Sequence, residues 1–353
     1  MVTALKTSIN ILLVFLFAAC TSVPDERMTP YVDFPETREL TARTLSLDSA
    51  LFRYPYRVRV QDDKAVVLDL HGTEYFFHAF HYPGFHYLSS FGKRGDAPEE
   101  MLSAENLRWN GNFLWTLDSN KSELTRLGFA SSGDSLLRLE AVSLDEELLR
   151  ALDFVQYDDS TFIIPDYSGD SRFCLVSRQG KLLHKIGTIP TTDEDALKNA
   201  HPALAQAWRS FIDYNPRNGA AVTQLGEVLE IYNLKDSTHI VRIGPNGEPE
   251  FQISQGYGIP TGIMGFSDIQ VTDSAIYVVF QGRAFKDIMQ KAQQGINLPD
   301  GGQNIYVFSL EGKPLRKYVL EHYIHGISVD EQKGIIIATD VNKDEPIIEY
   351  KLL

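Results

Sequence analysis

Cysteine is nearly absent from this sequence. The 353 residues include two cysteines, Cys20 and Cys174, and Cys20 falls where we expect the chain to be cleaved and modified. No disulfide bond within the mature chain is therefore predicted. Cys174 lies in the apolar stretch Phe173–Val176, so we expect a buried thiol rather than a nucleophile.

Basic residues are outnumbered by acidic ones. The chain has 33 lysines and arginines against 47 aspartates and glutamates, a formal net charge of −14. Removal of residues 1–19 would take away one lysine and no acid, leaving 32 basic against 47 acidic residues and a charge of −15. A surface of this sign repels phosphate backbones, so we expect no nucleic-acid partner.

The common catalytic motifs are missing. The sequence contains no Gly-x-Ser-x-Gly, no His-Glu-x-x-His and no Walker A segment. These absences argue against the usual serine hydrolases, zinc proteases and nucleotide-hydrolysing enzymes. No cofactor is expected from the sequence.

No hydrophobic run near the N-terminus is long enough to span a bilayer. The run Ile11–Ala19 has nine residues and follows a single cationic residue, Lys6. A transmembrane helix needs about 20 apolar residues, whereas a signal peptide needs fewer. Residues 1–19 are therefore predicted to be a signal peptide.

The end of this segment, Leu16-Phe17-Ala18-Ala19-Cys20, resembles the lipobox of bacterial lipoproteins. It predicts a lipid on Cys20, a tether over residues 20–36, and attachment through that lipid to a membrane of the bacterial cell envelope. We expect the outer membrane, with the protein facing the periplasm or the exterior. Two or more acyl chains suffice for firm anchoring. The alternative is an ordinary signal peptide followed by an incidental cysteine.

What the sequence does contain is one pattern repeated six times. A short apolar run, often closed by an aspartate, is followed by a second strand-like stretch, and five of the six units carry a glycine turn. The ends of successive runs are 48 to 60 residues apart, a period typical of propeller blades. The runs are Ala65–Asp69, Phe113–Asp118, Thr161–Asp166, Ala220–Thr223, Ala275–Phe280 and Gly334–Asp340.

Each unit is interpreted as one four-stranded blade, so the sequence predicts an all-β, six-bladed β-propeller over residues 37–353. The alternating segment Leu40–Leu47 precedes the first unit, and the last unit lacks an outer strand. The N-terminal strand is therefore expected to complete the last blade. Two short helical insertions are predicted, at Asp193–Phe211 and Phe285–Gln294.

The lipobox, the six degenerate units and the segment Phe91–Glu100 together resemble the TolB-like six-bladed propeller lipoproteins of Gram-negative bacteria. The resemblance covers essentially the whole mature chain. It implies the propeller fold, a location in the cell envelope and a binding role. It implies no catalytic residues, because the family offers none that can be carried over.

A ligand site is predicted where the central channel opens, because the residues leading into the innermost strands should surround that opening. These polar and aromatic groups could bind a sugar or a peptide, or they could satisfy one another and ordered water. The residues are Tyr56, Arg57, Asn106, Arg108, Asp153, Tyr214, Asn215, Ser267, Asp268, His322 and His325.

Two functions follow as hypotheses. The first is a noncatalytic envelope lipoprotein that binds a glycan, a peptide or a protein partner on one propeller face. The alternative is a divalent-metal-dependent hydrolase similar to gluconolactonase, with Asn106, Asn215 and Asp268 as oxygen ligands at the channel mouth. Arg57 argues against the second hypothesis, because a guanidinium beside a bound cation is electrostatically unfavourable.

Overall fold

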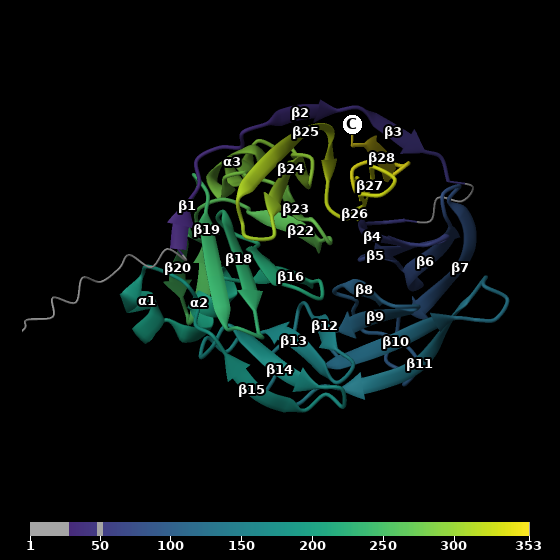
Figure 1. The fold of residues 1–353 in the computed structure, drawn as a ribbon, viewed down its shortest axis with the longest axis horizontal. Coiled ribbons are helices and arrows are strands. Elements are labelled where there is room, and N and C mark those ends of the chain that lie inside the picture. Colours follow the sequence, from purple (N-terminus) through teal and green to yellow (C-terminus); the bar gives the residue numbers. More distant parts are fainter. Residues whose placement is uncertain (1–27, 48–51, 353) are drawn as a thin grey trace, which may run out of the picture.

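The computed structural model describes residues 28–47 and 52–352. In this part of the chain, six sheets stand as blades around a common axis (Figure 1), which confirms the predicted all-β, six-bladed propeller. Each blade contains a meander of four antiparallel strands that runs from the axis to the periphery.

The strands of the first three blades are given from the axis outward. Blade 1 contains β4 (Pro55–Gln61), β5 (Lys64–Asp69), β6 (Tyr75–His81) and β7 (His86–Lys93). Blade 2 contains β8 (Leu107–Asn110), β9 (Phe113–Asp118), β10 (Glu123–Phe129) and β11 (Leu136–Ser143). Blade 3 contains β12 (Val155–Asp158), β13 (Thr161–Pro165), β14 (Phe173–Ser177) and β15 (Leu182–Ile186).

The other three blades follow the same order. Blade 4 contains β16 (Ser210–Tyr214), β17 (Gly219–Thr223), β18 (Val228–Asn233) and β19 (Thr238–Ile243). Blade 5 contains β22 (Phe266–Val271), β23 (Ala275–Phe280), β24 (Gly302–Ser309) and β25 (Pro314–Ile324). Blade 6 contains β26 (Ile327–Asp330), β27 (Ile335–Thr339), β28 (Ile347–Lys351) and, from the N-terminal segment, β3 (Ala42–Leu45).

The N-terminal segment closes the ring, as predicted, because β3 pairs antiparallel with β28. Two earlier strands extend neighbouring blades in parallel: β1 (Met28–Pro30) pairs with β19, and β2 (Thr37–Leu40) pairs with β25. Within the described residues, β1 thus lies inside the segment 20–36 that was predicted as a tether. Pro30 is tolerated in β1 because β1 is an edge strand. After it, the rings of Tyr31 and Phe34 each pack edge-on against Phe308.

The six apolar runs form the second strand of each blade, where neighbouring strands and blades cover them. The aspartates that close several runs have a structural role. Asp69 is buried, and its carboxylate accepts hydrogen bonds from the backbone N–H groups of Arg53 (2.8 Å) and Tyr54 (2.6 Å). Asp118 accepts a hydrogen bond from the Leu102 N–H in the same way (2.7 Å). These carboxylates hold the segments that lead into the innermost strands.

The hydrophobic core lies between neighbouring blades. For example, Trp115 of β9 contacts Phe162 of β13, with ring centroids 5.0 Å apart. Cys174 belongs to the same cluster and is a free, buried thiol, as predicted. Burial raises its pKa to about 12, so it is protonated at neutral pH.

The first helical insertion consists of two helices instead of the single segment Asp193–Phe211. α1 (Glu194–Asn199) begins at Asp193, whose carboxylate caps the first turn. α2 (His201–Ala207) follows a break at Ala200. Pro202 lacks an N–H and its ring would collide with the carbonyl four residues earlier, so one continuous helix cannot form. The helical segment ends before Phe211, which lies in β16.

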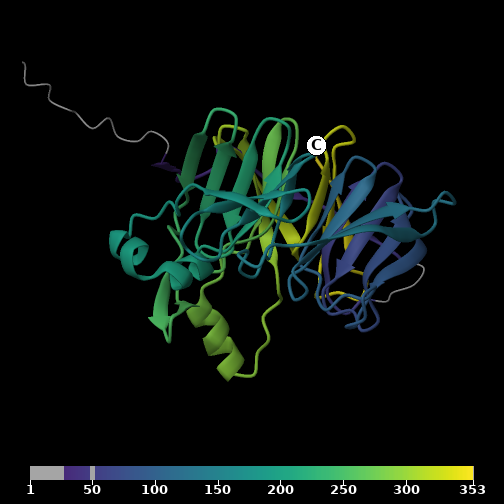
Figure 2. The same ribbon diagram turned by 90° about the horizontal axis from the view of Figure 1, so that it is seen from below.

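The second insertion forms α3 (Phe285–Gln293), and a hairpin of β20 (Phe251–Ser254) and β21 (Tyr257–Pro260) joins blades 4 and 5. The hairpin and the helices lie on one side of the ring (Figure 2). They are on the face at which the innermost strands begin, which we call the start face; the opposite one is the end face. Within the described residues, no helix is long and apolar enough to cross a membrane.

Candidate functional site

A cavity of about 410 Å³ opens on the start face around the propeller axis. Three parts of the fold form its walls: the segments that begin the innermost strands, the loops that follow the second strands, and the chain next to the insertions. The lining residues are Tyr54, Tyr56, Leu70, His71, Phe211, Gln224, Leu225, Met264, Phe266, Ser267, Gln281, Asp300 and His325.

Four rings form an aromatic wall on the blade 1 side of this cavity. The Tyr54 ring stacks on Tyr56 at a centroid distance of 6.1 Å and lies 4.8 Å from His71. His325 is 5.1 Å from Tyr56 and 5.6 Å from Tyr54. Such rings offer flat apolar faces beside polar edges, a combination that suits a ligand with both kinds of surface.

An acidic group joins this wall because of the α3 insertion. Asp300 follows the helix, and its backbone N–H donates a hydrogen bond to the Asn342 side chain (2.8 Å). Its carboxylate accepts a hydrogen bond from the Tyr54 hydroxyl, and Oδ1 lies 3.2 Å from Nε2 of His325. The hydrogen bond from His325 holds the pKa of Asp300 well below its usual range, whereas burial raises that of Tyr54. Asp300 is thus an ionised acceptor at the cavity edge.

A buried arginine lies next to this cavity. The Arg57 guanidinium carbon is 4.2 Å from the Tyr56 ring centre and 4.5 Å from that of Phe211. Its Nη1 donates to the His325 carbonyl (3.3 Å), and its Nε lies 3.4 Å from Asp268. Among the described residues, neither Arg57 Nη2 nor His325 Nδ1 has a hydrogen-bond partner. These two nitrogens leave hydrogen-bonding capacity for water or for a ligand.

Asp268 links three blades at the axis. Its carboxylate accepts hydrogen bonds from the N–H groups of Ile269 (2.9 Å) and Ile327 (2.8 Å) and from Arg59 (2.8 and 2.9 Å). Burial alone would raise the pKa of Asp268, but the charges of Arg57 and Arg59 outweigh it and lower the pKa to about 2. Asp268 is therefore a buried, ionised link between blades 5, 6 and 1.

Asp153 plays the same part between blades 3 and 4. Its carboxylate accepts hydrogen bonds from Phe154 N–H and Ile212 N–H, each 2.8 Å long, and pairs with Arg108 at 3.0 Å. Three arginines thus meet three acids around the axis, so the formal charges balance: Arg57, Arg59 and Arg108 with Asp153, Asp213 and Asp268. The hydrogen bonds that Asp153 and Asp268 accept make this network rigid, and Arg57 Nη2 is left without a partner in it.

Comparison with known proteins identifies the family. A model of the TolB-like 6-blade propeller-like family matches residues 33–332. The chain belongs to this family. Comparison with curated protein sequences finds no match.

Solved structures share the fold of this TolB-like propeller. A putative exported protein of Bacteroides fragilis is 10% identical, with a TM-score of 0.57 over 92% of this chain and 98% of that one. An auxiliary nutrient binding protein of Bacteroides ovatus is 10% identical, with a TM-score of 0.55 over 88% and 76% of the two chains. At this identity the likeness concerns the fold.

The TolB-like propeller gathers part of the predicted site at one place. Tyr56, Ser267 and His325 line the start-face cavity, and Arg57 and Asp268 lie close to it. Asn106 and Arg108 are near one another at the axis, where the Asn106 amide and the Arg108 guanidinium both donate hydrogen bonds to Asp153.

Three other predicted residues lie elsewhere. Tyr214 is the last residue of β16, and Asn215 follows it, so both are near the end face, where the Asn215 amide donates to the Thr272 carbonyl (2.6 Å). His322 belongs to the outer strand β25, and its Nδ1 lies 2.9 Å from Asp340. The start-face cavity is therefore built without them.

The three oxygen ligands considered for a metal are not brought together. Asn106 donates its amide to Asp153, Asn215 is near the opposite end of the axis, and Asp268 is paired with two arginines. Nor does the described part of the chain contain a group of three or more His, Cys, Asp or Glu side chains suited to a metal ion.

Several cavity residues were missed by sequence reasoning. His71, Gln224 and Gln281 stand one or two positions after the apolar runs of blades 1, 4 and 5. Because second strands all end on the start face, this repeated position was a usable signal. Tyr54 precedes the first innermost strand by one residue. Asp300 carried no such signal, because its place depends on the path of the α3 insertion.

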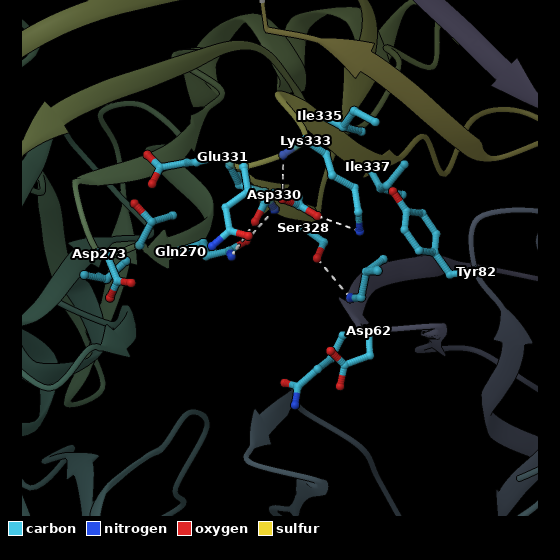
Figure 3. Close-up of a pocket in the computed structure, with 16 residues that line it drawn as sticks. Asp62, Tyr82, Gln270, Asp273, Ser328, Asp330, Glu331, Lys333, Ile335 and Ile337 are labelled. Carbon is cyan, nitrogen blue, oxygen red and sulfur yellow. Dashed lines mark hydrogen bonds and ion pairs between the residues drawn. The ribbon is translucent and has the colours of Figure 1, made fainter.

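A second cavity, of about 440 Å³, lies on the end face between blades 5, 6 and 1 (Figure 3). Two of the four acidic side chains that line it, Asp330 and Glu331, are already bound to neighbouring residues. Asp330 pairs with Lys333 at 2.9 Å, and Glu331 accepts hydrogen bonds from Ser274 (2.6 Å) and Tyr277 (3.0 Å). We therefore regard the start-face cavity as the stronger candidate.

Proposed function

We propose that this TolB-like propeller is a noncatalytic, lipid-anchored protein of the bacterial cell envelope that binds a glycan in its start-face cavity. The observation that carries the proposal is the cavity itself, an aromatic wall next to amide and carboxylate groups. Its volume of about 410 Å³ falls within the range of about 300–1,000 Å³ that small-molecule pockets occupy.

The chemistry of the walls favours a sugar. The ring faces of Tyr54, Tyr56 and His71 offer apolar surface to the C–H groups of a pyranose, and Gln224 and Gln281 can both donate and accept hydrogen bonds. Asp300 supplies an ionised acceptor for hydroxyl groups. The name of the Bacteroides ovatus neighbour, an auxiliary nutrient binding protein, is compatible with a binding role.

Export and anchoring complete the proposal. The signal-like residues 1–19 and the lipobox before Cys20 lie outside the described residues, and the Bacteroides fragilis neighbour is named as an exported protein. We expect the wild-type chain in the membrane fraction of a bacterial host and a Cys20→Ser variant in the soluble periplasmic fraction. Equal fractionation of the two would contradict the lipid anchor.

The ligand proposal is tested with the soluble chain that begins at Thr21. Thermal-shift titration with neutral disaccharides and with dipeptides should raise the melting temperature for at least one disaccharide, since a ligand specific for the native state stabilises it by mass action. The bulky variant Gln281→Trp should abolish that shift, because Gln281 lines the start-face cavity.

The matched control is Gln332→Trp, at an exposed residue of the end-face cavity, which should leave the shift unchanged. Loss of binding in Gln332→Trp but not in Gln281→Trp would move the site to the end face. A shift with dipeptides alone, or with none of the compounds, would contradict a glycan site.

A further inference from the structure

The hairpin β20–β21 and helix α3 project from the start face as neighbours with a common base. The Phe285 N–H donates to the Gly262 carbonyl (3.0 Å), and Ile263 forms an antiparallel bridge with Ala284. The hairpin also rests on α2, because the Gly258 N–H donates to the Gln206 side chain (3.0 Å). These contacts fix the bases of the projections and leave their outer parts uncovered.

One edge of the hairpin is open. The hairpin has a two-residue turn, Gln255-Gly256, so Ser254 and Gln252 form the hydrogen-bonded pairs with β21. By alternation, the backbone groups of Phe251 and Ile253 point outward. β21 faces α2, and β20 has no strand partner on its other side within the described residues. Figure 2 shows the hairpin and α3 projecting on the same side of the ring, and their bases are joined by the Ile263–Ala284 bridge.

Apolar side chains are exposed on the hairpin and on α3. Ile253 is 57% exposed, Tyr257 60% and Met289 of α3 62%. Along α3, the apolar residues Phe285, Ile288, Met289 and Ala292 follow helical spacing and share one stripe. None of the residues of α3 is buried, so this stripe has no full partner within the described fold.

The charge of α3 is opposite to that of the protein. Residues 281–299 carry Arg283, Lys286 and Lys291 against Asp287, a net charge of +2 in a chain of −14. With 3.6 residues per turn, Lys286 lies on one side of the apolar stripe and Lys291 on the other. Both lysines are exposed. Neither lysine has an acidic partner in the part of the chain that the structure describes.

We propose that the β20 edge and the α3 stripe form a docking surface for an extended, acidic segment of a partner protein. The segment adds as a strand to the outward backbone groups of Phe251 and Ile253, places apolar side chains against α3, and pairs its carboxylates with Lys286 and Lys291. An open strand edge suits a polypeptide, whereas unpaired backbone groups are unfavourable in lipid. The proposal is independent of the cavity ligand.

The probe is a fluorescein-labelled octapeptide of alternating glutamate and valine, followed by fluorescence anisotropy with the soluble chain. Saturable binding is expected, with at least tenfold weaker affinity for the double variant Lys286→Glu/Lys291→Glu. The double variant Lys235→Glu/Lys343→Glu changes the net charge equally at exposed residues of other blades and should bind as the wild type does.

Strand addition is tested first by a change in the protein and then by a change in the peptide. Ile253→Pro removes an outward N–H without touching the β21 pairing, and should weaken binding at least tenfold. A second test changes the peptide and leaves the protein unchanged. Two peptides are compared, one N-methylated at the odd-numbered residues and one at the even-numbered residues; one of them should lose binding and the other should keep it. This test holds even where the proline variant folds poorly.

Three results would overturn the proposal: no binding of the acidic peptide, equal binding of a lysine–valine peptide, or equal binding of both N-methylated peptides and the unmethylated one. Binding of wild-type protein, but not Met289→Glu, to phosphatidylglycerol vesicles would assign the surface to a membrane. Self-association that Ile253→Pro abolishes would assign it to a second copy of this chain.

Discussion

Among the residues that the structure describes, Asp268 is the one carboxylate paired with both Arg57 and Arg59, and replacement by asparagine removes it. Both guanidiniums are buried, and Arg59 donates two hydrogen bonds to this carboxylate. The Ile269 and Ile327 N–H groups donate to different oxygens of Asp268, so the single oxygen of asparagine can replace one of these acceptors. Two positive charges also then lie in the interior with no direct counter-ion. The structure therefore predicts a large loss of stability from a nearly isosteric change.

The magnitude follows from the cost of an unpaired buried charge. Removing one partner of a buried ion pair costs about 3–5 kcal/mol. The entropy of unfolding is about 2.1 cal/mol/K per residue near the melting temperature, so the described part of the chain, about 320 residues, gives roughly 0.7 kcal/mol per degree. Asp268→Asn should thus lower the melting temperature by roughly 4–7 °C.

The matched control is Asp153→Asn. Arg108, the partner of Asp153, retains a second carboxylate, because Asp213 lies 3.0 Å from it. The control should therefore lower the melting temperature by clearly less than Asp268→Asn does. Thermal unfolding followed by circular dichroism at pH 7 measures both. A shift below about 2 °C for Asp268→Asn, or an equal shift for the two variants, would refute the account of the buried charges.

Three further predictions concern acid, the thiol and ring closure. The pKa of Asp268 is lowered to about 2 from 3.8, so its contribution of about 2 kcal/mol is complete above pH 4 and lost as the pH falls toward 2; the melting difference between wild type and Asp268→Asn should narrow over that interval, and a constant difference would contradict it. Cys174, whose pKa is raised to about 12 by burial, should resist Ellman's reagent in native protein that begins at Thr21 and react fully in guanidinium, whereas fast native reaction would place it at the surface. A chain that begins at Met28 should melt like the longer one, while a chain that begins at Leu47 lacks β1, β2 and β3 and should melt more than about 5 °C lower; equal melting would show that these strands do not close the ring.

The sequence was sufficient to predict the blades because their second strands are buried and therefore apolar over five or six consecutive residues. The closing strand β3 could be predicted as well, since Leu40–Leu47 alternates. β1 and β2 could not: they are short and polar, and they pair in parallel with outer strands far away in the sequence. Their stability depends on Tyr31 and Phe34 packing against blade 5, which no local pattern reveals.

The sequence placed some of the predicted residues at the start-face cavity, and the different positions of the others have identifiable causes. The helix predicted to run through Phe211 displaced the expected start of β16, so Tyr214 and Asn215 were placed at the wrong end of that strand. The outer strand β25 continues to Ile324, which takes His322 away from the cavity. Asp300 enters the cavity only through the course of a long insertion, and tertiary structure alone determines that course.

The central claim is that the ligand enters at the start face. Hydrogen–deuterium exchange of the soluble chain, with and without the disaccharide that gives the largest thermal shift, tests it directly. We predict slower exchange in residues 54–57, 70–72, 264–267 and 300–302, which surround the start-face cavity. Slower exchange confined to residues 270–274 and 328–333, around the end-face cavity, or no change in either region, would contradict the claim.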